Sequence, residues 1–339
     1  MLSDVMKAIV LRETGGPERL LLEQVSNPDP GPGEAVVALR AAALNHRDAW
    51  IRKGLYAGIR LPIILGSDGA GVVAEVGPGV ERSWVGRPVV INPSLGWGAD
   101  ARAQAPSYKI LGLPDNGTYA ERVKVPAENL FAKPDALSWE QAAAVPLAGL
   151  TAYRALVTRA QVVRGETVLI TGIGGGVATF ALLIARHLGA RVIVTSGSDA
   201  KLARAGQLGA GGGVNYTSEG WAKRAKSLCD GGPDVVVDSA GRDAFPDLLD
   251  IVKPGGRIVT FGATTGSPAA IEIRRIFWKQ ISILGSTMGT PAEFAEMLAL
   301  FGGDLVPVVD RVFPMAAAPD AHRRMDQADQ FGKIVLEIR

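Results

Sequence analysis

The chain has 339 residues, 47% of them hydrophobic and 21% charged, with a formal net charge of +2. This length allows two domains with a substantial core, and the composition is that of an ordinary globular protein. The balanced charge offers no basic surface for nucleic acid, and no apolar run reaches the length of a membrane span. Since the first residues lack the pattern of a secretory signal, we expect a cytoplasmic protein.

Short strands, interrupted by glycine and proline, are predicted from the start of the chain to about residue 131. Five segments carry the pattern: 6–12, 35–42, 71–76, 88–92 and 120–125. Turn sequences separate them, for example at 77–79. This spacing is typical of a mostly β domain that forms a partly closed barrel. Segment 93–114 has little periodicity and is expected to be a long loop.

Helices and strands alternate over the next part of the chain, from Ser138 to about residue 288. Ser138 is the expected N-cap of a first helix, which runs to residue 155. Strands are predicted at 168–171, 191–195, 213–216, 234–238, 256–261 and 282–285. Such alternation is typical of a doubly wound parallel sheet, and gives an α/β fold class. A last strand, 333–338, is expected to return to the first domain.

A glycine-rich turn follows the first strand of this alternating region. Gly172 and Gly174 to Gly176 supply four glycines within five positions, and a helix is predicted from Val177 to residue 187. A turn without Cβ atoms lets a pyrophosphate approach backbone N–H groups at a helix N-terminus. We therefore expect Gly174, Gly175, Gly176 and Val177 to bind a dinucleotide. The alternative is a turn that binds nothing, because this motif alone is weak.

The end of the second strand decides which dinucleotide is expected. In this motif an acidic residue about 20 positions beyond the glycines usually binds the ribose 2′-OH of NAD. Here the strand ends at Ser196 and Ser198, with Lys201 close by and Tyr216 beyond the next strand. Hydroxyls and a cation suit a 2′-phosphate, so NADPH is predicted rather than NADH. Asp199 is the exception and is expected to cap the following helix. Alone, Lys201 would be interpreted as a solvated helix charge, but beside Ser196 and Ser198 we favour a role at the phosphate.

Cysteine and histidine are scarce in this chain. Cys229 is the only cysteine, which excludes an intrachain disulfide and a four-thiolate zinc site, and we expect it to be inert. The three histidines, His46, His187 and His322, are isolated in sequence, so no histidine-rich metal cluster is expected. His322 lies beside two arginines and is predicted to be a surface residue of a helix.

Several segments together resemble one enzyme family over nearly the whole chain. They are ALNHRD (43–48), GSDGAG (66–71), NGTYA (116–120), AGLTAY (148–153) and QFGKIV (330–335). The chain resembles the medium-chain dehydrogenase/reductases, and most closely their zinc-free quinone oxidoreductase and enoyl reductase branch. This resemblance implies a GroES-like β-barrel domain, predicted at 1–131 with 304–339, and a Rossmann NADPH-binding domain at 132–303. It also implies a homodimer that associates through the strand near 282–286.

The resemblance also allows the zinc-ligand positions of this family to be compared with the residues of this chain. Zinc-dependent relatives hold the catalytic zinc at positions that map to Asn45, Ser67 and Leu147. Leucine cannot ligate a metal, and neutral asparagine and serine are poor ligands for zinc. The loop that carries structural cysteines in zinc relatives resembles segment 93–114, which has none. No metal site is therefore predicted.

The remaining chemistry favours a particular class of small-molecule acceptor. Reduction of a simple ketone needs strong polarisation of its carbonyl, commonly by a metal or a positioned acid. Reduction of a carbon–carbon double bond conjugated to a carbonyl is less demanding, because the charge is delocalised into an enolate. We therefore expect an NADPH-dependent reductase of quinones or α,β-unsaturated carbonyl compounds such as enones and enals. The alternatives are a zinc-free ketone or alcohol oxidoreductase and a non-catalytic NADPH-binding protein.

Asn45 and Tyr56 are the candidate catalytic residues. The Asn45 amide could bond the cofactor ribose or the substrate carbonyl, or it could simply cap a turn. Tyr56 resembles a tyrosine that faces the nicotinamide in quinone oxidoreductases, where it could donate a proton or stack on substrate; an ordinary loop aromatic is the alternative. By resemblance, Thr151 lies beside the nicotinamide and Lys333 belongs to a segment that closes over the cofactor. Arg47 could contribute charge or face solvent at a helix start.

Overall fold

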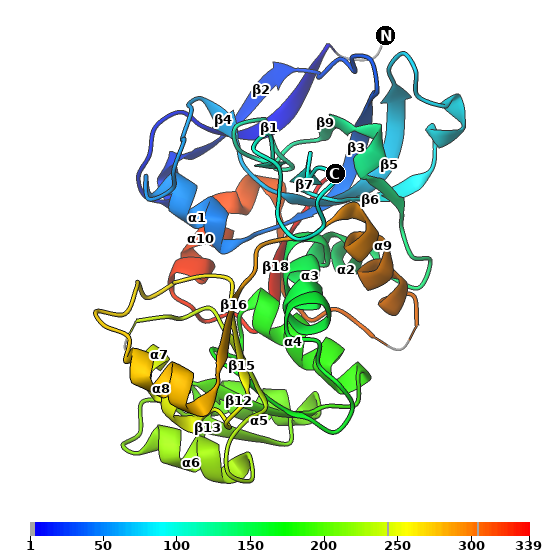
Figure 1. Ribbon diagram of the computed structural model, residues 1–339. Coiled ribbons are helices and arrows are strands. Elements are labelled where there is room, and N and C mark those ends of the chain that lie inside the picture. The colour runs from blue at the N-terminus through cyan, green and yellow to red at the C-terminus, as the bar shows by residue number, and fades with distance from the viewer. Residues whose placement is uncertain (1–3, 243, 304) are drawn as a thin grey trace. The chain divides into compact units, whose positions relative to one another are not determined.

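The computed structural model describes residues 4–242, 244–303 and 305–339. The chain divides into two compact units, one formed by Met1–Leu150 with Gly289–Arg339 and the other by Thr151–Met288 (Figure 1). Residues 132–150 and 289–303 group with the first unit here, whereas the sequence pattern assigns them to the second domain. Both units combine helices and strands, so the predicted α/β class is confirmed.

The first unit is built around a seven-stranded sheet of order β10-β6-β5-β3-β18-β17, with β9 also pairing with β3. Its strands are β3 (Glu34–Ala43), β5 (Asp68–Val76), β6 (Pro88–Ile91), β9 (Arg122–Pro126), β10 (Leu130–Ala132), β17 (Val309–Pro314) and β18 (Lys333–Glu337). The C-terminal strand β18, red in Figure 1, is antiparallel to β3, as expected, with Val335 opposite Ala43. This pairing sets Lys333 beside the end of β3.

Two small sheets complete the strands of this unit. A three-stranded sheet contains β1 (Val5–Leu11), β2 (Leu20–Ser26) and β4 (Ile63–Ile64), and a two-stranded one contains β7 (Ser94–Leu95) and β8 (Lys109–Ile110). Segment 93–114 is thus a loop with one short hairpin. The strands that enclose the core alternate buried and exposed side chains, for instance in β9, because successive residues of a strand face opposite sides.

The helices of the first unit are short. They are α1 (His46–Arg52), α2 (Trp139–Ala144), α9 (Pro291–Leu300) and α10 (Ala318–Asp326), with 3₁₀ turns at Pro17–Arg19, Arg82–Trp84, Ala127–Asn129 and Met315–Ala317. Helix α3 (Pro146–Tyr153) begins in the first unit and ends in the second. The predicted helix 138–155 is divided before Pro146, since proline has no N–H to donate; Ser138 caps α2, accepting a bond from the N–H of Gln141. No helix in the described ranges is long and apolar enough to cross a membrane.

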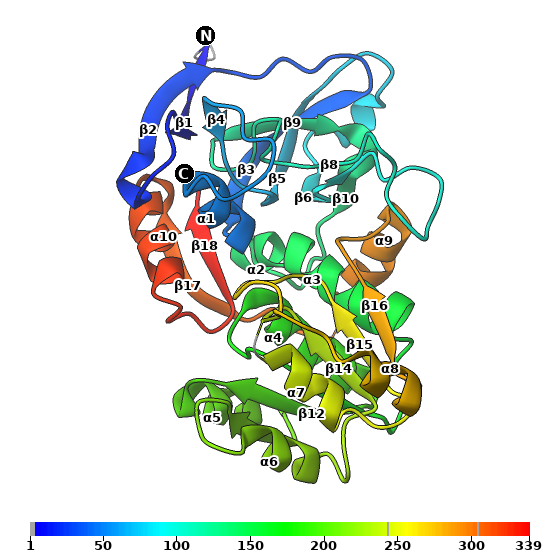
Figure 2. The ribbon, with the colours of Figure 1, turned by 60° about the vertical axis from the view of Figure 1, so that its left-hand side comes forward.

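The second unit contains a six-stranded parallel sheet of order β13-β12-β11-β14-β15-β16. Its strands are β11 (Thr167–Ile170), β12 (Arg191–Ser196), β13 (Gly212–Asn215), β14 (Val235–Asp238), β15 (Arg257–Thr260) and β16 (Ser282–Gly285). Its helices are α4 (Gly176–His187), α5 (Asp199–Gln207), α6 (Trp221–Leu228), α7 (Ala244–Ile251) and α8 (Ile273–Lys279), after a π-helical turn at Arg154–Arg159. Figure 2 shows α5 beside β12, and α6 contacts the neighbouring strand β13. The predicted doubly wound parallel sheet is confirmed.

One residue predicted at the surface is buried. The side chain of His322 in α10 is fully enclosed, and its Nδ1 accepts a bond from Arg52 Nε at 3.3 Å. Arg52 also donates to Asp326 at 2.6 Å. The prediction for His322 was wrong because the neighbouring arginines, Arg323 and Arg324, lie on other faces of the helix, which sequence proximity alone does not separate.

Candidate functional site

The glycine-rich turn of the second unit connects β11 to α4. Gly172 and Gly174 have φ angles of +65° and +116°, in a region that side chains with a Cβ rarely adopt. Gly175 is the N-cap of α4, and no side chain in the described part of this unit caps the helix. The first N–H groups of α4, including those of Gly176 and Val177, therefore have no side-chain acceptor. An uncapped helix N-terminus behind a turn without Cβ atoms fits a pyrophosphate.

The end of β12 forms a compact polar loop, which we call the β12 loop (196–201). Ser196 is buried, and its Oγ accepts a bond from the N–H of Ser198 at 3.1 Å. Ser198 in turn is the N-cap of α5 and accepts from the N–H of Lys201 at 3.4 Å. The cap is thus Ser198, and the expectation that Asp199 caps this helix is wrong. Because both hydroxyl oxygens act as acceptors, their hydrogens remain available to an anion.

Tyr216 and Asp199 complete the surroundings of the β12 loop. Tyr216 follows β13 and is half exposed. Its hydroxyl lies close to Gly197, only 3.0 Å from the position that a Cβ would take on that residue. The Asp199 carboxylate accepts a bond from the side-chain amide of Asn215 at 2.8 Å, which engages the only acidic group of this loop. The structure thus brings Ser196, Ser198 and Tyr216 together, with Lys201 in the first turn of α5.

Thr151, the remaining candidate in the second unit, lies in a different environment. It belongs to α3, is buried, and its Oγ1 is 3.8 Å from Met288 Sδ. Its predicted place beside a nicotinamide stays a prediction.

In the first unit, three side chains that are distant in sequence form a buried cluster, which we call the Asn45 cluster (Asn45, Asp68 and Lys333). The Lys333 ammonium donates to Asp68 Oδ2 at 2.8 Å, to Asn45 Oδ1 at 2.6 Å and to the Leu44 carbonyl at 2.7 Å. These acceptors use all three of its hydrogens, and only 3% of the side chain is exposed. Lys333 is therefore held inside the first unit, and it would influence a bound cofactor only by orienting Asn45.

The cluster fixes the orientation of the Asn45 amide. Asn45 Nδ2 donates to Asp68 Oδ2 at 3.0 Å, while Oδ1 faces the Lys333 ammonium. Since an ammonium only donates and a carboxylate only accepts, the amide cannot be flipped. One Nδ2 hydrogen is not used by this cluster. Asn45 is also the N-cap residue of α1 and forms a capping box with Asp48, so the capping alternative holds together with the role of its side chain in the cluster.

The positions that correspond to zinc ligands in the resembling family are occupied by other contacts. The Leu147 N–H donates to Asp68 Oδ1 at 2.8 Å, and the Ser67 hydroxyl donates to the Leu111 carbonyl at 2.8 Å. Arg47 Nη1 donates to that same hydroxyl at 2.7 Å. Among the described residues, no three His, Cys, Asp or Glu side chains converge in a way that could hold a metal. The cations of Lys333 and Arg47 are bonded to Asn45 and Ser67, and the third position is a leucine, so these side chains do not fit a zinc site.

Arg47 and the aromatic residues around it form the other half of this region. Arg47 is 8% exposed, so a solvent-facing helix start does not describe it. Its guanidinium lies over the Tyr56 ring, with Cζ 5.3 Å from the ring centroid. Tyr56 also packs against the hydrophobic core of this unit, and its predicted place at the nicotinamide stays a prediction. Tyr108, which the sequence did not single out, has a buried hydroxyl, and burial raises the pKa of Tyr108 to about 12.

Asp48 connects α1 to the core of the first unit. Its Oδ2 accepts bonds from the Asn45 N–H at 2.8 Å and from the Tyr119 hydroxyl at 3.0 Å. Burial raises the pKa of Asp48, and the nearby Arg47 opposes that shift. Asp48 thereby ties α1 to the core and orients the residues on either side of it. The sequence offers no signal for these contacts, because Tyr119 lies 71 positions away.

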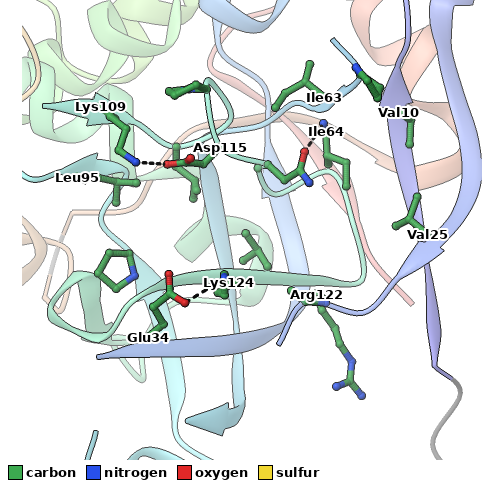
Figure 3. Close-up of a pocket in the computed structure, with 18 of the residues that line it drawn as sticks. Val10, Val25, Glu34, Ile63, Ile64, Leu95, Lys109, Asp115, Arg122 and Lys124 are labelled. Carbon is green, nitrogen blue, oxygen red and sulfur yellow. Dashed lines mark hydrogen bonds and ion pairs between the residues drawn. The ribbon is translucent and has the colours of Figure 1, made fainter. Parts of the chain in front are cut away.

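A separate cavity of about 860 Å³ lies in the first unit. Its apolar lining includes Val10, Val25 and Ile64, and Figure 3 shows two ion pairs across it, Lys109–Asp115 at 2.6 Å and Lys124–Glu34 at 3.0 Å. None of the predicted site residues line this cavity. Each of the lining cations forms an ion pair with a carboxylate; these cations are Arg12, Lys109, Arg122 and Lys124.

Comparison with known proteins agrees with this architecture. Residues 31–135 match the family model of the alcohol dehydrogenase GroES-like domain, and residues 176–302 match that of the zinc-binding dehydrogenases. The expected GroES-like domain is therefore confirmed. The second match is to a family named for zinc, whereas Asn45, Ser67 and Leu147 of this chain bond to Lys333, Arg47 and Asp68.

Individual relatives are similar along nearly their whole lengths. The chain is 36% identical to the zinc-type alcohol dehydrogenase-like protein YogA of Leptosphaeria maculans, over 94% of both chains. It is 35% identical to a quinone oxidoreductase of Pseudomonas aeruginosa, over 97% of this chain and 99% of the relative. A solved structure described as an NAD-dependent alcohol dehydrogenase is 44% identical, with a TM-score of 0.94 over 98% of this chain and 100% of the other.

Proposed function

The chain belongs to the medium-chain dehydrogenase/reductase superfamily of oxidoreductases, and on that premise we propose that it reduces a quinone or an α,β-unsaturated carbonyl compound with NADPH and without zinc. The observation that carries the proposal is the chemistry at three positions: neutral Asn45 and Ser67 are bonded to the cations of Lys333 and Arg47, and the Leu147 side chain has no ligating atom. An acceptor whose negative charge spreads over a conjugated system suits a site that offers hydrogen-bond donors alone.

The residues present fit a dinucleotide, and those of the β12 loop favour the phosphorylated one. Gly174, Gly175, Gly176 and Val177 would hold the pyrophosphate at the start of α4. The Ser196 and Ser198 hydroxyls and the Lys201 cation would hold the 2′-phosphate, with Tyr216 beside them. Asp199, the group that would repel a phosphate, is bonded to Asn215. When bound, the cofactor supplies a hydride.

The residues of the Asn45 cluster would orient and donate. Lys333 and Asp68 hold the Asn45 amide so that its second Nδ2 hydrogen has a fixed direction, available to a cofactor hydroxyl or a substrate oxygen. The bonds within the cluster hold these dipoles in fixed directions, and such preorganised donors are the kind that stabilise developing charge. Thr151 and Tyr56 are proposed to line the nicotinamide and the acceptor.

A second candidate function is oxidation and reduction of alcohols and ketones with NADH. It is favoured by the 44% identity to a structure described as an NAD-dependent alcohol dehydrogenase. The two candidates differ in acceptor and in cofactor, so one assay separates them. The third possibility, an NADPH-binding protein without turnover, predicts cofactor binding and no reaction with either class of acceptor.

We also propose that two copies of the chain associate through β16. This strand is the last in the order of the parallel sheet, and Ser282, Ile283 and Gly285 are exposed along it. An exposed strand edge can pair with the same edge of a second copy. Light scattering should then give the mass of a dimer, and Ile283→Lys should give a monomer; a monomeric wild type would contradict this arrangement.

The function itself is tested by following NADPH and NADH oxidation with a panel of enones, enals, quinones and simple ketones. We expect turnover with NADPH and conjugated acceptors, and at least tenfold lower kcat/KM with simple ketones. Turnover restricted to alcohols and ketones with NADH would favour the second candidate. Tight NADPH binding without turnover of any acceptor would favour the third.

A further inference from the structure

We propose that Arg47 is a catalytic residue that binds the carbonyl oxygen of the acceptor through Nη2 and stabilises the oxyanion formed there. This inference rests on the proposed reduction of a conjugated carbonyl compound and names the group that receives its charge. It is argued from the contacts of one buried guanidinium within the first unit.

The first observation is that one side of the guanidinium is fixed while the other is left open. Nη1 donates to the Ser67 hydroxyl at 2.7 Å and to the Leu111 carbonyl at 2.8 Å. The Tyr56 ring covers one face of the plane, with its centroid 5.3 Å from Cζ. In the described parts of the chain no bond engages Nη2, which keeps accessible surface, whereas the unpartnered Nε is buried. Nη2 is therefore a rigidly held donor without an acceptor.

The second observation is that the charge of Arg47 lacks a carboxylate partner. Its acceptors are a hydroxyl and a carbonyl, and within 4–242, 244–303 and 305–339 no ion pair includes it. Arg52, one and a half turns further along α1, shows the contrast. Its side chain is 1% exposed and pairs with the Asp326 carboxylate at 2.6 Å. A buried cation without a counter-ion is costly unless a ligand brings negative charge to it.

The nearest acid does not neutralise Arg47 directly. Asp48 is adjacent in sequence, but its Oδ2 is engaged by Asn45 and Tyr119, and its buried Oδ1 has no hydrogen-bond partner among the described residues. The electrostatic attraction between Asp48 and Arg47 lowers the free energy needed to bury the guanidinium, but Asp48 accepts no hydrogen bond from Nη2. The guanidinium thus keeps both its charge and one free nitrogen for an oxygen atom of a ligand.

Reduction of a conjugated carbonyl compound places negative charge on its carbonyl oxygen. A hydride adds to the β-carbon of the acceptor, and the electron pair of the carbon–carbon double bond moves to form the enolate. Its negative charge develops on the carbonyl oxygen, where the two Nη2 hydrogens donate to it. A proton from water then reaches the α-carbon, so the product has gained a hydride and a proton while NADPH has become NADP⁺. Arg47 is neither consumed nor deprotonated.

The inference is tested with Arg47→Met, Arg47→Lys and, as the matched control on the same helix, Arg52→Met. We expect Arg47→Met to lower the single-turnover rate of NADPH oxidation by an enone about 100- to 1,000-fold, as loss of an oxyanion donor does. Arg47→Lys should retain part of the rate, because it keeps the charge but not the forked geometry. Arg52→Met should lower the melting temperature and leave the rate of the folded fraction within about threefold.

A binding measurement makes the result independent of turnover and of folding losses. 4-Nitrophenol resembles the enolate when it is ionised, and its phenolate absorbs visible light. With the NADP⁺ complex, we expect the bound phenol to ionise at lower pH in the wild type than in Arg47→Met. Ionisation at the same pH in both proteins, with melting temperatures alike, would overturn the proposal. If the wild type reduces no acceptor, the proposed function fails, and the phenol titration still decides whether Arg47 binds an oxyanion.

Discussion

The Asn45 cluster and the β12 loop are both candidate binding regions, but they are built differently. In the cluster, Lys333 is 3% exposed, Asp68 is fully buried, and each is bonded to residues far away in the sequence. In the β12 loop the bonds connect neighbours two or three positions apart, and Tyr216 is 49% exposed. The first region is part of the core that holds its unit together, whereas the second is a surface feature of an already complete sheet.

This difference teaches where specificity and stability reside in this chain. Changes in the Asn45 cluster should affect folding and activity together, because the same bonds serve both. Changes in the β12 loop should alter cofactor preference and leave the fold intact. The two regions can therefore be distinguished by measuring unfolding and binding on the same variants.

The largest expected effect is that of Lys333→Met. This change leaves the buried Asp68 carboxylate without its ammonium partner, which should lower the free energy of unfolding by about 3–5 kcal/mol. Lys53→Met is the control, since Lys53 pairs with Asp326 at 2.7 Å but is 39% exposed, and should cost under about 1 kcal/mol. Urea unfolding measures both. Equal losses in the two variants would show that the cluster is not the stabilising element inferred here.

An intermediate effect should appear in the pH dependence of stability through His322. Burial first, and then the positive charge of the adjacent Arg52, lower the pKa of His322 to about 3. An unfolded histidine titrates near pH 6.5, so the unfolded chain binds a proton that the folded chain refuses as the pH falls below that value. The free energy of unfolding should therefore decrease from about pH 6.5 towards pH 3, by about 2 kcal/mol at pH 5.

The matched variant for this prediction is His322→Gln. Whatever the stability of this variant at neutral pH, the component of acid sensitivity that belongs to His322 should be absent. Unfolding in urea at pH 7 and pH 5 gives the comparison. If the wild type and the variant lose the same free energy between these two pH values, His322 is not the group that resists protonation.

The smallest free-energy effect, and the one most confined to a single ligand, is expected in the β12 loop. Ser198→Asp keeps a good N-cap for α5 but adds a negative charge, so it should weaken NADPH about tenfold and leave NADH unchanged. Lys201→Ala should likewise weaken NADPH far more than NADH. Fluorescence titration with both cofactors measures these affinities, and Lys223→Ala, an exposed lysine of α6, is the control. Equal losses of affinity for both cofactors would show that these residues do not bind the 2′-phosphate.

Local sequence patterns predicted much of the fold. The strands of the parallel sheet and the start of α4 follow from apolar runs and glycines, which act over a few residues. The predicted helix 138–155 missed the break before Pro146, and His322 was placed on the surface, because packing partners such as Arg52 lie 270 positions away. Tertiary contacts of this kind leave no local pattern.

The candidate site was predicted less completely for the same reason. Asn45 and Lys333 were singled out separately through the family resemblance, but their bond joins residues 288 positions apart. The β12 loop was predicted more fully, since its residues are neighbours in the chain. Tyr108 was missed because it lies in segment 93–114, where no periodicity points to a buried side chain.

The central claim is that this member of the family reduces a conjugated acceptor with NADPH and no bound metal. It is tested most directly by assaying enone-dependent NADPH oxidation before and after dialysis against a strong chelator, with the metal content of the same samples determined by mass spectrometry. The account predicts full activity at far less than one zinc per chain. Activity that disappears with the chelator and returns with one zinc per chain would contradict it.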